Sequence, residues 1–155
     1  CEITDESKQV MTSSFGSIFQ QVCKTAASGF IEAIMLEGHT DNVPFFPGER
    51  VCGVERAHHA CLGKRTNSGE CAALGFANNV RLSAARAQNV FFQMREILNG
   101  HPEITSCLEA KFVVAGRGPV EPTDGKAWGL SRPESENEKN RRVVIKVRAT
   151  SRTRR

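Results

Sequence analysis

The sequence predicts an α/β fold in which one β-sheet packs against helices. Two stretches, residues 5–27 and 83–98, repeat apolar side chains every three or four positions, which is typical of helices with one buried face. Three short apolar runs, at 30–37, 112–115 and 143–147, have the length and composition of strands. The chain of 155 residues is long enough for one domain with a core, because domains commonly hold roughly 100–200 residues.

The first expected helix covers residues 5–27. Its apolar stripe consists of Val10, Met11, Phe15, Ile18, Phe19, Val22 and Ala26. Ser28-Gly29 follows, and glycine commonly ends a helix because it adopts the left-handed conformation without a steric penalty. The run Phe30 to Glu37 is apolar on both faces, so we expect it to form an interior strand of the sheet.

Residues 42–78 interrupt this regular pattern and read as an insertion. Prolines and glycines recur through it and leave little room for regular structure apart from one helical turn near Val54 to Leu62. Long connections inside a compact domain are usually functional or cross-linked. Because Cys52, Cys61 and Cys71 lie in this one, we expect disulfides to hold it.

Ser83 is expected to cap the N-terminus of the second helix, since a serine hydroxyl accepts a hydrogen bond from a free N–H of the first turn. The buried stripe of this helix would be Ala87, Val90, Phe91, Met94, Ile97 and Leu98. Asn99-Gly100 would end it. Phe112 to Ala115 then forms a short core strand, and residues 116–140 form a polar loop. In residues 142–148, basic and apolar side chains alternate, which predicts a final strand near an edge of the sheet.

The charge of the chain argues against a nucleic-acid-binding module. The 21 Lys and Arg exceed the 17 Asp and Glu by four, and four arginines in residues 148–155 account for that whole excess. We expect residues 149–155 to be a basic, disordered tail. The sequence contains no Tyr and no basic face with interleaved aromatic residues, so nucleic acid is not an expected partner.

The chain contains no membrane-spanning run, because no stretch approaches the ~20 apolar residues that a span requires. It also begins with Cys1 rather than Met and carries no signal peptide. We therefore expect the segment that targets the protein to lie outside these residues.

Asp41 and Arg86 are the residues to which the sequence assigns binding chemistry. Asp41 directly follows a strand, and Arg86 lies in the first turn of a helix that Ser83 caps. A cation there opposes the helix dipole by about 0.3–1 kcal/mol, unless an anion binds beside it. The pair would suit a small zwitterion, with its ammonium on Asp41 and its carboxylate on Arg86. The ordinary alternatives are a turn residue for Asp41 and a salt bridge for Arg86, with Asp41 itself as one candidate partner.

Further residues are expected to border this site. Asn79 would bond the ligand or its backbone, and Leu82 would supply an apolar wall, although leucine is more often plain core. Thr40 would offer its backbone to the ligand. His39 reads as a packed, hydrogen-bonded histidine, because no serine or cysteine nucleophile is arranged with it. The sequence thus predicts binding without a catalytic residue or a cofactor.

Four sequence blocks carry a resemblance to a known family. Gly-His-Thr-Asp ends at Asp41, and Asn-x-x-Leu-Ser-x-x-Arg-Ala runs from Asn79 to Ala87. Gly-Arg-Gly spans residues 116–118, and Asn-Arg-Arg-Val begins at Asn140. In these blocks, their order and their spread over most of residues 30–148, the chain resembles the peptidoglycan-binding domain of the OmpA/MotB/Pal type.

The resemblance implies a single mixed β-sheet packed against helices, the two-layer sandwich of the OmpA C-terminal type, formed by residues 1–148. It implies non-catalytic binding of peptidoglycan through the diaminopimelate group of the stem peptide. The implied ligand-binding residues are Asp41, Arg86, Asn79, Leu82, Thr40 and, of the two arginines before the last strand, Arg142. The family joins its first two blocks by a short link, whereas here 37 residues, 42–78, intervene.

The resemblance also implies an anchoring role in the cell envelope. The longer run Gly-His-Thr-Asp-Asn-Val-Pro and the long helix before it resemble the stator of an ion-driven motor, of the flagellar or the phage-defence type. The expected location is the periplasm, with a tether to the inner membrane through a segment absent from this chain. A membrane partner subunit and a homodimer are the expected assemblies.

The cysteines bear on the alternatives. Six cysteines fit disulfides formed in an oxidising compartment, and their pairing stays open because six allow 15 connectivities. Cys52, His58, His59, Cys61 and Cys71 could instead serve a zinc-dependent envelope hydrolase. Structural zinc sites usually separate paired cysteines by two to four residues, whereas eight and nine intervene here, so we expect no metal. A protein-interaction domain with a vestigial pocket is the other alternative.

Overall fold

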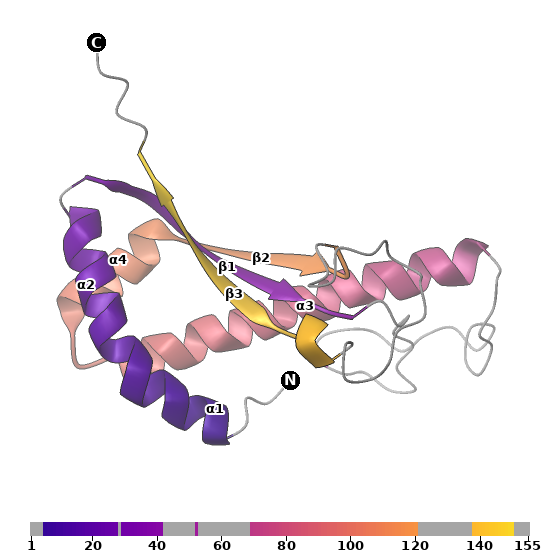
Figure 1. Ribbon diagram of the computed structural model, residues 1–155, viewed down its shortest axis with the longest axis horizontal. Coiled ribbons are helices and arrows are strands. Elements are labelled where there is room, and N and C mark those ends of the chain that lie inside the picture. The colour runs from indigo at the N-terminus through magenta and orange to yellow at the C-terminus, as the bar shows by residue number, and fades with distance from the viewer. Residues whose placement is uncertain (1–4, 28, 42–51, 53–68, 121–137, 151–155) are drawn as a thin grey trace, which may run out of the picture. The chain divides into compact units, whose positions relative to one another are not determined.

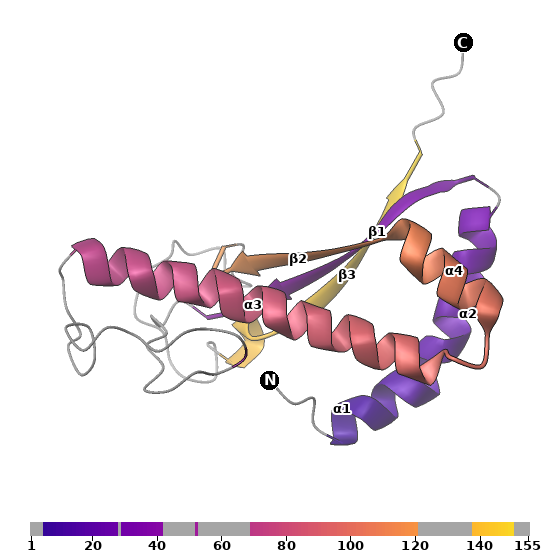
Figure 2. The ribbon, with the colours of Figure 1, turned by 180° about the vertical axis from the view of Figure 1, so that it is seen from behind.

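The computed structural model describes residues 5–27, 29–41, 52, 69–120 and 138–150. Its elements follow in the order α1 (Asp5–Val10), η1 (Met11–Phe15), α2 (Gly16–Ala27), β1 (Ile31–His39), α3 (Gly69–Ile97), α4 (Pro102–Lys111), β2 (Phe112–Gly118) and β3 (Val143–Ala149) (Figures 1 and 2). The predicted α/β class is confirmed, with one mixed sheet and helices.

The chain forms two compact units. The charged unit comprises Glu37–Ala87 and Ala115–Val144. The apolar unit comprises Glu2–Leu36, Gln88–Val114 and Ile145–Arg155. The names refer to the side chains that hold each unit together.

The sheet has the strand order β2-β1-β3, so β1 is central, as its apolar sequence predicts (Figure 1). β1 is antiparallel to β3, because the N–H of His39 donates to the carbonyl of Arg142 at one end and the N–H of Thr150 donates to that of Phe30 at the other. β1 runs parallel to β2, and the N–H of Thr40 donates to the carbonyl of Gly118 where both strands end. A parallel pair needs a crossover, and α3 and α4 provide it.

Residues 5–27 are helical as predicted, and Gly29 follows with a φ of 77°. The expected apolar stripe is only partly correct, because Met11 and Phe19 are buried whereas Val10 and Ile18 are half exposed. The π-helical turn η1 accounts for the difference. An i→i+5 turn takes up more residues than an α turn, so it shifts which side chains share a face.

The core of the apolar unit surrounds the first half of β1. Ile31 and Ile34 are buried there, and four partly buried residues pack against them: Val22, Cys107, Phe112 and Ile145. The ring of Phe112 lies 5.8 Å from that of Phe19 and 5.9 Å from that of Phe91. Helices α2 and α4 and strands β2 and β3 thus contribute to one cluster.

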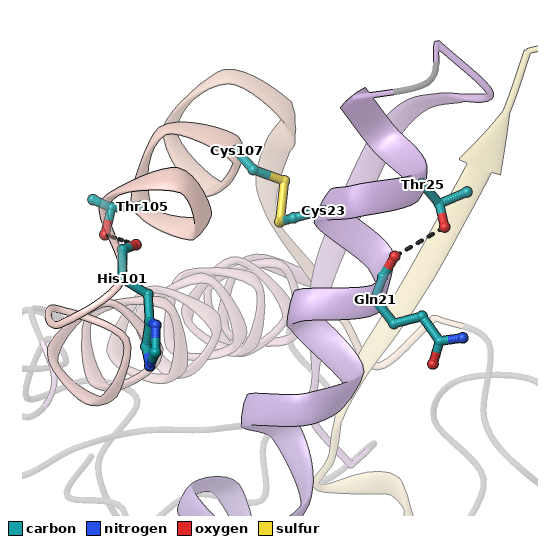
Figure 3. The surroundings of a disulfide bond; sticks show 6 residues. All are labelled: Gln21, Cys23, Thr25, His101, Thr105 and Cys107. Atoms are coloured by element: carbon teal, nitrogen blue, oxygen red, sulfur yellow. Dashed lines mark hydrogen bonds between the residues drawn. A yellow bond between two sulfur atoms is a disulfide. The ribbon is translucent and has the colours of Figure 1, made fainter.

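Helix α4 is an element that the sequence analysis missed. Its apolar periodicity is weak, and among its described side chains only Ile104 is fully buried. A disulfide between Cys23 of α2 and Cys107 joins it to the first helix (Figure 3). This bond confirms the expectation of disulfides, and Cys52 and Cys71 are also disulfide-bonded.

Helix α3 begins at Gly69, so the prediction of an N-terminal cap at Ser83 is wrong. Residues 69–78 of the expected irregular insertion are helical instead. Gly75 inside a helix costs roughly 1 kcal/mol relative to alanine, and tertiary packing of this face offsets that cost. Cys71, Asn78, Asn79, Leu82 and Ser83 are all buried. The C-terminal end of α3, before Asn99-Gly100, is as predicted.

The remaining boundaries differ by a few residues. β2 extends to Gly118 rather than ending at Ala115. β3 reaches Ala149, one residue beyond the predicted domain boundary, while the rest of the expected tail, 151–155, lies outside the described residues. The same holds for 42–51 and 53–68, which include the expected turn near Val54 to Leu62. None of the described helices is long and apolar enough to cross a membrane.

Candidate functional site

Two glycines bring the strands of the charged unit against α3. A Cβ built on Gly38 of β1 would lie 1.9 Å from the carbonyl oxygen of Ser83. One built on Gly116 of β2 would lie 2.6 Å from the backbone of both Val80 and Ala84. Any side chain at either position would therefore push backbone away from backbone. The glycines of two of the four sequence blocks thus fix where the ends of β1 and β2 meet α3.

Ser83 joins these elements. Its hydroxyl donates to the carbonyl of Val80 at 2.7 Å and accepts from the N–H of Gly118 at 2.8 Å. The side chain that the sequence analysis assigns to a helix cap therefore connects the interior of α3 to the end of β2.

Asp41 follows β1 and is buried, with 7% of its surface exposed. Its Oδ2 accepts a hydrogen bond from Nε of Arg141, and the two side chains form an ion pair. The sequence analysis assigns the second arginine before the last strand, Arg142, to the site. In the structure Arg141 pairs with Asp41, and the carbonyl of Arg142 accepts a hydrogen bond from the N–H of His39 at 2.8 Å. The expected place of the Arg142 side chain beside the ligand stays a prediction.

Arg86 lies in the interior of α3, so the expectation that it occupies the first helical turn is wrong. The positive end of the helix dipole and the free N–H groups of a first turn therefore lie at Gly69, where α3 begins, and not at Arg86. Arg86 nevertheless lies near Asp41. Burial lowers the pKa of Arg86, the negative charge of Asp41 raises it, and the positive charge of Arg141 lowers it.

The structure thus brings together the two residues that the sequence pairs, Asp41 and Arg86, and adds Arg141 as a third charge. Nη1 of Arg86 is buried and has no hydrogen-bond partner within the part of the chain that the structure describes. A buried donor without a partner loses hydration without compensation, which makes it a candidate for binding a ligand oxygen.

Thr40 differs from the expectation in one respect. Its backbone N–H is already used in the sheet, where it donates to the carbonyl of Gly118 at 2.9 Å. Its hydroxyl is the group to consider, because Oγ1 is buried and has no hydrogen-bond partner among the residues described. Thr40 is 4% exposed.

Asn79 and Leu82 lie within α3 rather than ahead of a cap. Asn79 is 2% exposed and Leu82 is 7% exposed, so both are buried in the charged unit. For Leu82 this agrees with the plain core role that leucine most often has.

A second charged group, which the sequence analysis did not identify, lies at the end of β1. Glu37 is 1% exposed, its Oε1 lies 3.4 Å from Nε of Arg117, and its Oε2 lies 3.8 Å from Nε2 of His39. His39 is equally buried, and its Nδ1 lies 3.3 Å from the carbonyl oxygen of Val120. His39 is therefore packed and hydrogen-bonded, as expected. The available signal was a second glutamate, Glu37, in a mostly apolar strand that also holds Glu32, together with Arg117 between two glycines.

The alternative constellation of cysteines and histidines is only partly described. Cys52 and Cys71 are disulfide-bonded, and a disulfide sulfur does not act as the thiolate ligand that zinc binds. His58, His59 and Cys61 lie outside the described residues.

No protein-family model matches the chain, and no curated protein is significantly similar to it.

Proposed function

We propose that the chain is a non-catalytic module that binds peptidoglycan through the diaminopimelate group of the stem peptide. In this proposal it anchors a membrane protein or complex, such as a motor stator, to the cell wall from the periplasm. A homodimer and a membrane partner subunit, joined through a segment outside this chain, belong to the same proposal. The proposal starts from the resemblance of four sequence blocks to the OmpA/MotB/Pal type.

The observation that carries the proposal is the convergence of Asp41 and Arg86. The two residues are far apart in the sequence, yet Asp41 lies close enough to raise the pKa of Arg86 against the effect of burial. The end of diaminopimelate has an ammonium and a carboxylate on one carbon. The ammonium would pair with Asp41 and the carboxylate with Arg86, whose planar guanidinium can bind both carboxylate oxygens.

Thr40 and the backbone geometry support the same site. The Thr40 hydroxyl can both donate and accept a hydrogen bond, so it can serve either end of the ligand. The close contacts of Gly38 and Gly116 with α3 hold Asp41 and Arg86 on elements that are packed backbone to backbone. Such rigid support reduces the ordering cost of binding.

The proposal is tested by co-sedimentation of the purified protein with isolated peptidoglycan sacculi. Asp41→Ala and Arg86→Ala should each lower the affinity about 10- to 100-fold, because each removes a charged hydrogen bond. The matched control is Arg148→Ala, which removes an exposed arginine paired with Glu32 in the apolar unit and should leave retention unchanged. Circular dichroism of each variant establishes that the fold is intact.

The alternatives predict different outcomes. If the Asp41–Arg141 pair is a purely structural contact in a protein-interaction domain, the unsubstituted chain and all variants sediment equally little. If the insertion forms a zinc site, the purified protein contains stoichiometric zinc by elemental analysis. Either result contradicts the proposed function.

A further inference from the structure

The carboxylate of Asp41 already forms an ion pair with Arg141. Arg141 donates from Nε to Oδ2 of Asp41. The side chain of Asp41 is 9% exposed and that of Arg141 is 37% exposed. A ligand ammonium that binds Asp41 must therefore share the carboxylate with Arg141 or displace it.

A second guanidinium, that of Arg86, is within electrostatic reach of this carboxylate. The pKa of Arg86 is lowered by burial, raised by Asp41 and lowered by Arg141, so the three charges act on one another. The trio has one more positive than negative charge, and Nη1 of Arg86 is buried without a hydrogen-bond partner among the described residues. One additional carboxylate would balance the charge of these three side chains and offer an acceptor to Nη1 of Arg86.

We propose that Arg141 determines the specificity of this site by acting as the resident counter-ion of Asp41. The ammonium of the ligand replaces Arg141 on Asp41, and the displaced guanidinium joins Arg86 on the ligand carboxylate. This inference rests on the proposed function and deepens it. The selected ligand class is an amino-acid head group that carries both charges on one carbon.

The exchange discriminates against ligands with one charge. An amine without a carboxylate displaces Arg141 from Asp41 and offers it no new partner. A carboxylate without an amine binds next to Arg86 but leaves Arg141 on Asp41, so it gains only one of the two guanidinium contacts. Only the zwitterion provides a partner for every charge. A ligand that leaves one of these charged groups unpaired binds less tightly, and this difference in affinity is the specificity.

The backbone around Arg141 is held by main-chain hydrogen bonds. The N–H of Arg141 donates to the carbonyl of Glu138 at 3.0 Å, and that of Arg142 donates to Asn140 at 3.1 Å. The carbonyl of Arg142 accepts from His39 in β1. These main-chain bonds hold the turn before β3, so replacing the side chain of Arg141 should leave the turn in place.

The test is calorimetric titration of the full, disulfide-bonded chain with three soluble stem peptides. The first ends in meso-diaminopimelate, the second carries the amidated form of its carboxylate, and the third carries lysine in its place. The unsubstituted chain should bind the first at least about tenfold more tightly than the other two, as expected when a charged hydrogen bond is lost.

Arg141→Gln should change the affinities in opposite directions. Binding of the diaminopimelate peptide should weaken about tenfold, because one carboxylate contact is lost. Binding of the lysine peptide should strengthen several-fold, because Arg141 no longer competes with the ligand ammonium for Asp41. Arg141→Lys keeps the charge without the planar fork and should retain part of the preference. Arg148→Gln is the matched control and should change neither affinity.

Each other outcome overturns the inference. Parallel weakening of all three peptides by Arg141→Gln would show a structural role, and unchanged affinities would show that Arg141 takes no part. If Arg141→Gln does not fold, a full diaminopimelate preference in Arg141→Lys would also contradict it, since the fork would then be dispensable. A chain that binds none of the peptides overturns the proposed function itself, whereas the other results overturn only the exchange.

Discussion

Strand β1 passes from the apolar unit into the charged unit, and its surroundings change from hydrocarbon to charged groups along the way. Ile31 and Ile34 are packed among apolar side chains in the first half. Glu37 and Asp41 are buried beside arginines at and beyond the other end.

The comparison teaches that one strand joins a part held by apolar packing to a part whose buried charges we propose as the binding site. Burial of apolar area is non-directional and favours folding without selecting a ligand. A buried charge costs desolvation energy and is therefore kept only with partners, but it can select a ligand by charge and geometry. Substitutions in the two halves should therefore separate unfolding free energy from peptidoglycan retention.

The largest expected effect is on stability in the apolar unit. Ile34→Ala removes buried methyl groups from a side chain that is 0% exposed and should lower the free energy of unfolding by about 2–5 kcal/mol. Urea denaturation with the disulfides intact measures this. Val113→Ala, at a 47% exposed position in the same unit, should change it by less than about 0.5 kcal/mol. Equal losses for the two variants would remove the distinction between core and surface.

Gly38→Ala tests the backbone contact that positions the charged unit. The new Cβ would lie 1.9 Å from the Ser83 oxygen, which belongs to the backbone and cannot rotate away. We expect a loss of about 1–3 kcal/mol, the usual cost of overpacking, and weaker retention on sacculi because β1 and α3 must separate. Gly100→Ala is the matched control, since nothing lies within 4 Å of that Cβ. Unchanged stability of Gly38→Ala would be incompatible with this contact.

The two glutamates of β1 provide the next comparison. Glu37→Gln removes a buried charge that pairs with Arg117 and should cost about 1–3 kcal/mol. Glu32→Gln removes one member of an exposed pair with Arg148, whose side chains are 51% and 68% exposed, and should cost less than about 1 kcal/mol. Thermal unfolding of both variants measures the difference. A larger loss for Glu32→Gln would contradict the expectation that the buried pair contributes more to the free energy of unfolding than the exposed pair does.

The smallest expected change in stability accompanies a large change in binding. Arg86→Met should leave the free energy of unfolding within about 1 kcal/mol or raise it, because a partly buried cation is replaced by an apolar chain and Asp41 keeps Arg141. Retention on sacculi should nevertheless be lost. An Arg86→Met variant that is strongly destabilised but still sediments with peptidoglycan would show that Arg86 contributes to folding and not to binding.

The lowered pKa of Arg86 predicts the sign of its contribution to the pH dependence of the free energy of unfolding. A base whose pKa is lower in the folded state binds its proton less tightly there, so the protonated form opposes folding below that pKa. Arginine remains protonated in proteins, so this contribution is constant across the neutral range. We therefore expect the stability difference between Arg86→Met and the unsubstituted chain to show no slope due to Arg86 between pH 6 and about 9. Denaturation at several pH values measures it.

Local sequence patterns predicted most of the fold. The span of the first helix, the central strand, the end of α3 and the last strand all follow from apolar periodicity and from glycine positions. Helix α4 could not be recognised from its ten residues, because their apolar periodicity is weak. The disulfide that joins Cys107 to Cys23 of α2 connects residues far apart in the chain, and the local sequence does not reveal it. The start of α3 was missed because Gly69 and Gly75 suggested an irregular segment. The helix face that carries Cys71, Asn78 and Asn79 becomes buried only in the folded chain.

The sequence alone determined that β1 is an interior strand, that glycines and a serine accompany Asp41 and Arg86, and that these two opposite charges are candidates for a common site. The tertiary structure decided the rest: Arg141 pairs with Asp41, Ser83 joins α3 to β2, and Glu37 is buried beside Arg117. The physical reason is range. Periodicity and turn chemistry act over a few residues, whereas the ion pair of Asp41 and Arg141 joins residues 100 positions apart, whose encounter depends on how the sheet assembles.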